Sequence, residues 1–190
     1  MQLLKDRIKK DGRIRERGVL KVDAFLNRQL DPALLLELAK EIGTRFGDAG
    51  VTRVLTIEPN AIALATFVAQ QLGCMAVFAK KSNKPGKPGT LSAKVHSYTT
   101  GIDSDVLLPE RYLSSEDRVL VVDDFLINGS AMNALLDLVR AAGATAVGAA
   151  VAIEYKNAKG GAWIRSQGVR VEALVTVDKL DPESGVSFSE

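Results

Sequence analysis

Residues 118–142 constrain the fold more than any other part of the chain. Residues 119–122 (Val-Leu-Val-Val) form a continuous branched apolar run, which is typical of a strand buried on both faces of a sheet. Asp123 and Asp124 end that run, a short loop at 128–131 follows, and a helical pattern covers 132–142. A strand that passes through a short loop into a helix is the building unit of an α/β sheet.

The acid pair and the loop have the chemistry of a site for a phosphorylated sugar. Ligands of open α/β sheets collect at the carboxyl ends of strands, and a helix N-terminus holds an anion. Gly129 lets the backbone close around a phosphate, and Ser130 adds a hydroxyl donor. Asp123 and Asp124 can only accept, which suits sugar hydroxyls or a magnesium ion. An acid pair before Asn-Gly is also ordinary turn chemistry, so spacing alone leaves both interpretations open.

Composition excludes several classes of protein. A chain of 190 residues suits one domain with a sizeable core, and a net charge of +2 gives no general surface for nucleic acid. A single cysteine, Cys74, excludes an internal disulfide and favours the reducing cytoplasm. The first residues do not resemble a signal peptide, and no apolar run reaches membrane-spanning length. We therefore predict a cytoplasmic protein that contacts neither membrane nor nucleic acid.

The remaining pattern alternates strands and helices. Strands are expected at 52–57, 74–79, 145–153 and 169–177, and helices at 2–12, 62–72 and from an N-terminal cap at Asp31-Pro32 to Gly47. Residues 18–27 are expected to be extended or irregular, 92–99 an antiparallel strand, 106–108 a short apolar piece and 158–167 weakly helical. A polar tail at 178–190 can dock through Val186 and Phe188. The alternation predicts an α/β fold with a central, mostly parallel sheet flanked by helices.

Residues 80–90 differ in composition from the rest, with four lysines, two prolines and two glycines. Such a segment cannot form a packed core, so it is either a solvated linker or a mobile basic lid over an anionic substrate.

The segment 118–131 resembles the phosphoribosyl-diphosphate (PRPP) motif of the type I phosphoribosyltransferases: four apolar residues, two acids, a short linker and a small-residue phosphate loop. That loop is usually Thr-Gly-rich. Here it reads Asn-Gly-Ser-Ala at 128–131 and, with 19–27 and 153–156, resembles the xanthine phosphoribosyltransferase branch. The resemblance covers nearly the whole chain. It implies one Rossmann-like domain over 1–190, with a flexible lid loop and a small purine-binding hood from about 1–30 and 150–190.

The resemblance also implies an activity. The 5-phosphoribosyl group of PRPP would pass to N9 of xanthine, giving XMP and pyrophosphate in purine salvage, with Mg²⁺ as cofactor and a homodimer as the assembly. Positive charge develops on the ribose as the pyrophosphate departs. A protein can stabilise that charge, neutralise the leaving group and exclude water.

Residue roles follow from matching this chain to the family motifs. The implied set comprises catalytic and metal-binding Asp123 and Asp124; PRPP-binding Asn128, Gly129, Ser130, Ala131 and Met132; a pyrophosphate loop of Glu58, Pro59, Asn60 and Ala61; lid lysines Lys80, Lys81 and Lys84; and purine-binding Leu20, Asn27 and Lys156. Related enzymes usually carry glycine near Ala61, and Pro59 permits a cis peptide bond to Glu58. Because adjacent strand residues point to opposite faces, both carboxylates can reach one sugar only if the strand turns between them.

The purine-binding residues have structural alternatives. A lysine supplies donors and charge to the carbonyl edge of xanthine, whereas adenine would present an amine to it. Lys156 could instead be a solvated charge at a strand end, and Leu20 a core residue. His96, the only histidine, is expected to be structural or exposed, and Trp163 to be a packing residue.

Three other functions remain open. One is a phosphoribosyltransferase for guanine, hypoxanthine, adenine or orotate. Another is a PRPP-sensing purine regulator, which would carry a helix-turn-helix ahead of this fold; only a short segment precedes the family match here. The third is a non-catalytic effector-binding module, which the intact acid pair disfavours.

Overall fold

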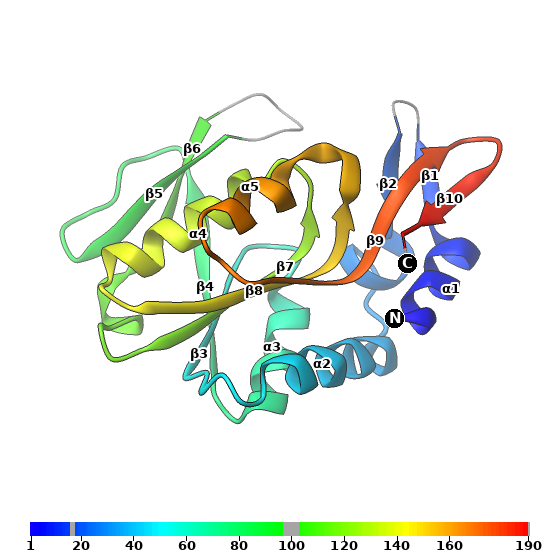
Figure 1. Ribbon diagram of the computed structural model, residues 1–190. Coiled ribbons are helices and arrows are strands. Elements are labelled where there is room, and N and C mark those ends of the chain that lie inside the picture. Colours follow the sequence, from blue (N-terminus) through cyan, green and yellow to red (C-terminus); the bar gives the residue numbers. More distant parts are fainter. Residues whose placement is uncertain (16–17, 97–102, 190) are drawn as a thin grey trace.

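A computed structural model describes residues 1–15, 18–96 and 103–189. An eight-stranded sheet crosses the molecule, with strand order β10-β9-β8-β7-β3-β4-β6-β5 (Figure 1). Its strands are β3 (Arg53–Ile57), β4 (Met75–Ser82), β5 (Thr90–His96), β6 (Asp103–Pro109), β7 (Arg118–Leu126), β8 (Thr145–Tyr155), β9 (Val171–Asp181) and β10 (Gly185–Phe188). The helices are α1 (Gln2–Asp11), α2 (Pro32–Phe46), α3 (Ile62–Leu72), α4 (Ser130–Ala141) and α5 (Gly160–Ser166). Short helical turns are η1 (Asp23–Asn27), η2 (Glu110–Tyr112) and η3 (Lys156–Ala158), and β1 (Arg13–Arg15) pairs with β2 (Val19–Lys21).

The centre of the sheet is parallel, as the alternation of strands and helices predicts. Strands β9, β8, β7, β3 and β4 run in one direction, while β10, β6 and β5 pair antiparallel with their neighbours. The carboxyl ends of the parallel strands therefore meet at one edge, and the loops that follow β3 and β7 lie beside each other.

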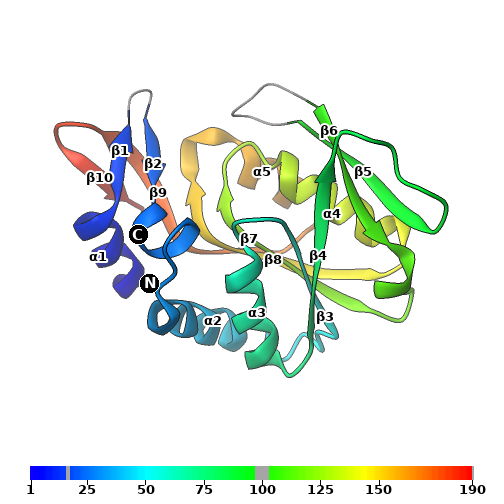
Figure 2. The same ribbon diagram turned by 180° about the vertical axis from the view of Figure 1, so that it is seen from behind.

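Strand β7 is buried on both faces. Leu120 and Val122 pack in the core cluster that contains α2 and α3, whereas Val119 and Val121 pack in the cluster that contains α4. Figures 1 and 2 show these helices on opposite sides of the sheet. Successive side chains of a strand alternate between faces, so an unbroken apolar run is what a strand between two helical layers needs.

The helix signals are confirmed. The Asp31 carboxylate accepts the N–H groups of Ala33 and Leu34 at 3.1 Å each, and Pro32 occupies the first position of α2. Helix α3 has the expected bounds and ends at Gly73 in the left-handed conformation with φ 66°. None of the helices in the described ranges is both long and apolar enough to cross a membrane.

Several strands extend further than the sequence indicates, and two of these extensions, in β7 and β4, affect the candidate site residues. Strand β7 continues through Leu126 because Phe125 and Leu126 pair with Ile153 and Glu154 of β8, so the acid pair lies inside the strand. Strand β4 continues to Ser82 because its last three residues pair with β6, so Lys80 and Lys81 belong to a strand rather than to a loop.

The C-terminal segment is not a plain polar tail. Strand β9 runs to Asp181 and β10 turns back along it, with Val186 and Phe188 packed against the core cluster as their docking requires. The α-amino group of Met1 donates to the carbonyl of Leu174 at 2.9 Å. Elements from both ends of the chain, α1, β1, β2, η1 and the β9–β10 hairpin, therefore gather at one end of the molecule (Figures 1 and 2).

The remaining expectations are largely met. The irregular segment 18–27 contains β2 and η1, and the weakly helical segment 158–167 contains α5. The apolar piece at 106–108 is the middle of β6, which pairs antiparallel with β5. Residues 97–99 of the predicted antiparallel strand lie outside the described residues.

Candidate active site

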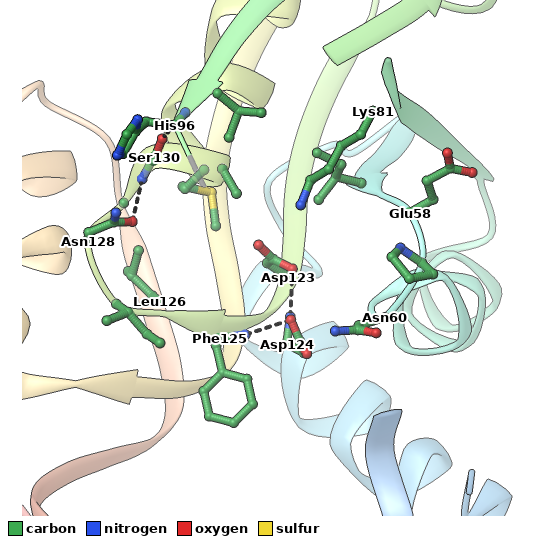
Figure 3. Close-up of a pocket in the computed structure, with 17 residues that line it drawn as sticks. Glu58, Asn60, Lys81, His96, Asp123, Asp124, Phe125, Leu126, Asn128 and Ser130 are labelled. Carbon is green, nitrogen blue, oxygen red and sulfur yellow. Dashed lines mark hydrogen bonds between the residues drawn. The ribbon is translucent and has the colours of Figure 1, made fainter. Parts of the chain in front are cut away.

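A cavity of about 220 Å³ opens at the carboxyl ends of β3 and β7. Its walls come from residues 57–60, Lys81, residues 95–96 and residues 123–132 (Figure 3). The structure thus brings together the acid pair, the 128–132 loop and most of the Glu58–Ala61 turn.

The acid pair is nearly inaccessible, with Asp123 6% and Asp124 7% exposed. Asp123 Oδ1 accepts the N–H of Asp124 at 2.9 Å, and Asp124 Oδ1 accepts the N–H of Phe125 at 3.0 Å. Asp124 Oδ2 is buried without a hydrogen-bond partner among the described residues. A buried acceptor without a hydrogen bond costs free energy of folding. This oxygen therefore indicates a position where a bound ligand or cation supplies the missing partner.

Burial raises the pKa of Asp123 well above its usual value, and the negative charge of Asp124 raises it further. Lys81, across the cavity, acts in the opposite direction. A cation or ligand hydroxyls at this position would favour the charged form of Asp123.

The expected turn between the two acids is absent, because β7 continues past them. Strand β3 pairs with β7 only as far as Val121, so the edge of β7 beyond that residue is free on the β3 side. The cavity lies along this free edge, and both carboxylates line it without a turn (Figure 3).

The 128–131 loop includes the first two residues of α4, which begins at Ser130 and not at 132 as the sequence predicts, and hydrogen bonds hold it in shape. Asn128 Oδ1 accepts the N–H of Ser130 at 3.1 Å, and Ser130 Oγ accepts the N–H of His96 at 2.9 Å. Gly129 precedes α4 with φ 81°, a left-handed conformation that favours glycine. The loop is therefore shaped before any ligand arrives, with the N-terminus of α4 directed at the cavity.

Helix α5 packs directly against the back of this loop. The N–H of Gly160 donates to the carbonyl of Ile127 at 3.0 Å, and a Cβ at position 160 would overlap that carbonyl oxygen. The ring of Trp163 would lie 3.0 Å from a Cβ on Gly129, which agrees with a packing role for the tryptophan. Sequence reasoning missed this contact; its only signal is the Gly160-Gly161 pair at the start of a weak helix.

An ion pair between a half-exposed arginine and a buried glutamate holds α5 to β8. Arg165 donates to both carboxylate oxygens of Glu154, at 2.6 and 2.8 Å, and Glu154 is 6% exposed. A bidentate guanidinium–carboxylate pair fixes orientation as well as distance. It thereby also fixes where Gly160 meets the phosphate loop.

The turn after β3 contains a cis peptide bond between Glu58 and Pro59, as the sequence allows. Glu58, Pro59 and Asn60 line the cavity. Ala61 is fully buried at the start of α3 and does not line it.

The three lid lysines occupy different places. Lys81 projects into the cavity (Figure 3), whereas Lys80 lies 3.9 Å from the Glu58 carboxylate. Lys84 is exposed in the connection between β4 and β5. His96 is exposed, as expected, and also lines the cavity beside Ser130.

The three proposed purine residues lie away from this cavity. Leu20 is buried, and its N–H donates to the Tyr155 hydroxyl at 3.0 Å. Asn27 Oδ1 is buried without a partner in the described ranges. The side chain of Lys156 is 56% exposed, and its ammonium lies 3.5 Å from the Asp178 carboxylate.

Two aromatic residues that sequence reasoning overlooked connect the cavity to the segment that contains Leu20. Phe125 lines the cavity next to the acid pair, and its ring makes a T-shaped contact with the ring of Tyr155, with the centroids 5.9 Å apart and the planes at 83°. Tyr155 in turn reaches Leu20. An aromatic residue directly after the acid pair was the available signal.

The described residues contain no group of three or more His, Cys, Asp or Glu side chains placed to hold a metal ion. The acid pair alone fits a magnesium ion that takes most of its ligands from phosphates and water.

Comparisons with known proteins agree with this geometry. The model of the phosphoribosyl transferase domain family matches residues 29–179. A xanthine phosphoribosyltransferase of Heliobacterium modesticaldum is 41% identical over 182 residues, covering 96% of this chain and 97% of that protein. One of Pseudomonas putida is 43% identical, with both chains covered completely.

Solved structures show the same fold. The APRTase from Giardia lamblia, complexed with 9-deazaadenine, superposes with a TM-score of 0.77 at 22% identity and covers 93% of this chain and 98% of that one. Adenine phosphoribosyl transferase from Trypanosoma brucei, in complex with AMP, pyrophosphate and ribose-5-phosphate, superposes with a TM-score of 0.75 at 19% identity; the match covers 91% and 79% of the two chains.

Proposed function

This chain belongs to the phosphoribosyltransferase family, and we propose that it is a xanthine phosphoribosyltransferase of purine salvage. It would transfer the 5-phosphoribosyl group of PRPP to N9 of xanthine, releasing XMP and pyrophosphate. One observation carries the proposal: a buried acid pair and a preformed anion loop line a single cavity. The relatives named for this activity support the choice of base.

The 5-phosphate of the substrate belongs at the loop Asn128, Gly129, Ser130, Ala131 and Met132. This loop presents backbone N–H groups at the N-terminus of α4, where the helix dipole favours an anion. Gly129 provides the left-handed turn that sets this loop, and its missing Cβ lets α5 pack closely behind it.

The acid pair would act on the ribose. Asp123 and Asp124 can accept hydrogen bonds from the 2′ and 3′ hydroxyls, and their negative charge stabilises the positive ring carbon of the transition state. The unpaired Oδ2 of Asp124 supports this role because a sugar hydroxyl would satisfy it.

The leaving pyrophosphate would lie on the β3 side. Glu58, Pro59 and Asn60 line that wall, with Ala61 behind them at the start of α3. Lys81 would neutralise the leaving charge directly. Lys84 would join it when the exposed connection between β4 and β5 closes as a lid, while Lys80, which is held in β4, would add its charge from beside Glu58.

Magnesium fits this arrangement as a cofactor shared with PRPP. Asp123 and Asp124 would supply the protein oxygens, and substrate phosphates and water would supply the others. Bound there, the ion would offset the negative charge of the pyrophosphate.

The hood, formed by about residues 1–30 and 150–190, would hold the base. Leu20 would cover an apolar face, and Asn27 Oδ1 would gain a donor from the purine, which its unpaired state supports. Lys156 would add positive charge near a carbonyl edge, acting at a distance while its ammonium remains beside Asp178.

The working form would be a cytoplasmic homodimer. The first half of β4 supports the dimer because it pairs with β3 alone and leaves Met75 68% and Phe78 42% exposed. A second copy would cover these side chains. Phe78→Asp should convert the dimer to a monomer in light-scattering chromatography; an unchanged mass would contradict this interface.

The function is tested by incubating the protein with PRPP, magnesium and each of xanthine, guanine, hypoxanthine and adenine. We expect XMP and pyrophosphate from xanthine first, with weaker use of guanine or hypoxanthine. Faster turnover of another base would assign a different specificity. Absence of pyrophosphate with every base would instead support a PRPP-sensing regulator.

A further inference from the structure

Tyr155 links the strand of the acid pair to the N-terminal part of the hood. It is the last residue of β8, and its ring meets Phe125, the residue after Asp124. Its hydroxyl reaches the other way and accepts the N–H of Leu20 from β2. Through Tyr155, two segments 135 positions apart in the chain are joined next to the proposed purine site.

The hydrogen-bond capacity of this hydroxyl is only partly used. A phenol oxygen both accepts and donates, and the bond from Leu20 uses an acceptor site. The O–H group has no acceptor within the described part of the chain. Burial raises the pKa of Tyr155, so the proton stays on the oxygen throughout the neutral range.

We propose that Tyr155 is a base-recognition residue whose hydroxyl donates a hydrogen bond to an exocyclic carbonyl of the purine. This inference rests on the proposed function and extends it, because it identifies the direct donor at the end of β8 as the tyrosine and not the adjacent lysine. Lys156 follows the strand in η3, and more than half of its side chain faces solvent.

Asn27 supplies the complementary group. Its buried Oδ1 is an acceptor without a described partner, and it lies on the same hood segment as Leu20. A donor from Tyr155 together with an acceptor from Asn27 fits the amide edge of an oxopurine, where a carbonyl adjoins a ring N–H. Adenine presents an amine and a bare ring nitrogen, which is the opposite pattern, so both groups would disfavour it.

The test removes one oxygen atom by changing Tyr155 to Phe. The affinity for XMP and for ribose 5-phosphate is measured by calorimetry, and KM is measured for xanthine and PRPP. We expect about tenfold weaker XMP binding and a similar rise in the xanthine KM, because one buried hydrogen bond is lost. Ribose 5-phosphate affinity and the PRPP KM should stay within about twofold, since neither ligand carries the base.

A matched control is Tyr112→Phe, which removes a hydroxyl that only accepts from Arg111 on the surface. It should leave every value unchanged. Equal affinity of Tyr155→Phe and the unmodified protein for XMP would overturn the inference. So would equal losses for XMP and ribose 5-phosphate, which would mean that the hydroxyl only supports the fold. Unmodified protein that forms nucleotide from adenine but not from xanthine would instead refute the proposed function.

Discussion

The two sides of the proposed site are built in different ways. The phosphate side comes from consecutive elements, β7, the 128–131 loop and α4, and is braced from behind by α5. The base side comes from opposite ends of the chain, which share one core cluster and are joined by hydrogen bonds such as those of Leu20 with Tyr155 and Met1 with Leu174. A preformed loop suits the phosphoribosyl group, which is the same whichever base is used, whereas the hood has to distinguish one base from another.

The difference between the phosphate side and the base side predicts the largest loss of activity at the acid pair. Asp123→Asn keeps the shape and the acceptor for the N–H of Asp124 but removes a buried charge. Turnover should fall by about 100-fold or more, as expected when a group that stabilises transition-state charge is lost. Steady-state assays at saturating PRPP and xanthine measure the effect. Turnover close to that of the unmodified protein would show that Asp123 lies outside the chemistry.

The same variant should be more stable at neutral pH. The pKa of Asp123 is raised on folding, so its contribution to stability is present at low pH and is lost as pH rises through the folded value. Removing the charge should raise Tm at pH 8 by about 2–4 °C for each kcal/mol gained. The difference should shrink as acid protonates Asp123. A lower Tm than the unmodified protein at pH 8 would contradict the raised pKa.

Gly160→Ala tests the brace behind the phosphate loop. The added methyl group would overlap the carbonyl of Ile127, so the loop must shift. We expect the KM for PRPP to rise about tenfold, with a smaller change for xanthine, because misplacement of a binding group by an ångström is severe.

Gly43→Ala is the matched control for this change, since its methyl group would meet only the Gln71 side chain at 3.2 Å. It should leave both KM values unchanged. If Gly160→Ala raises the KM values for PRPP and xanthine equally, the contact of α5 does not support the phosphate side in particular.

Asn27→Leu tests the base side with a smaller effect. Loss of one neutral acceptor should raise the xanthine KM by about three- to tenfold, with PRPP unaffected. Tm should not fall, because the change removes a buried polar oxygen that has no partner among the described residues. A lower Tm with an unchanged KM would make Asn27 a structural residue.

Lys156→Ala should have the smallest effect. The ammonium is half exposed and beside Asp178, so its attraction for the base is screened by water and salt. We expect the xanthine KM to rise about two- to threefold at low salt and less at high salt, with no change for PRPP. Equal changes in the KM values for xanthine and PRPP would show that Lys156 does not act on the base.

The same contrast explains what the sequence could predict. The β7 run, the Gly129 turn and the Asp31 cap carry local signals that do not depend on distant partners. The extensions of β4 and β7 depend on pairing with β6 and β8, which propensity cannot report. Contacts of Gly160 and Tyr155 join segments far apart in the chain, so the local signals, a Gly-Gly pair and an aromatic residue after the acid pair, did not identify the partners. The three residues matched to the purine came only from family resemblance.

The most direct test of the central claim is a crystal structure of the protein with PRPP and magnesium. The account predicts that the 5-phosphate binds the backbone N–H groups of residues 128–132 and that the ribose hydroxyls face Asp123 and Asp124. A 5-phosphate bound at any other place, with this loop unoccupied, would contradict it.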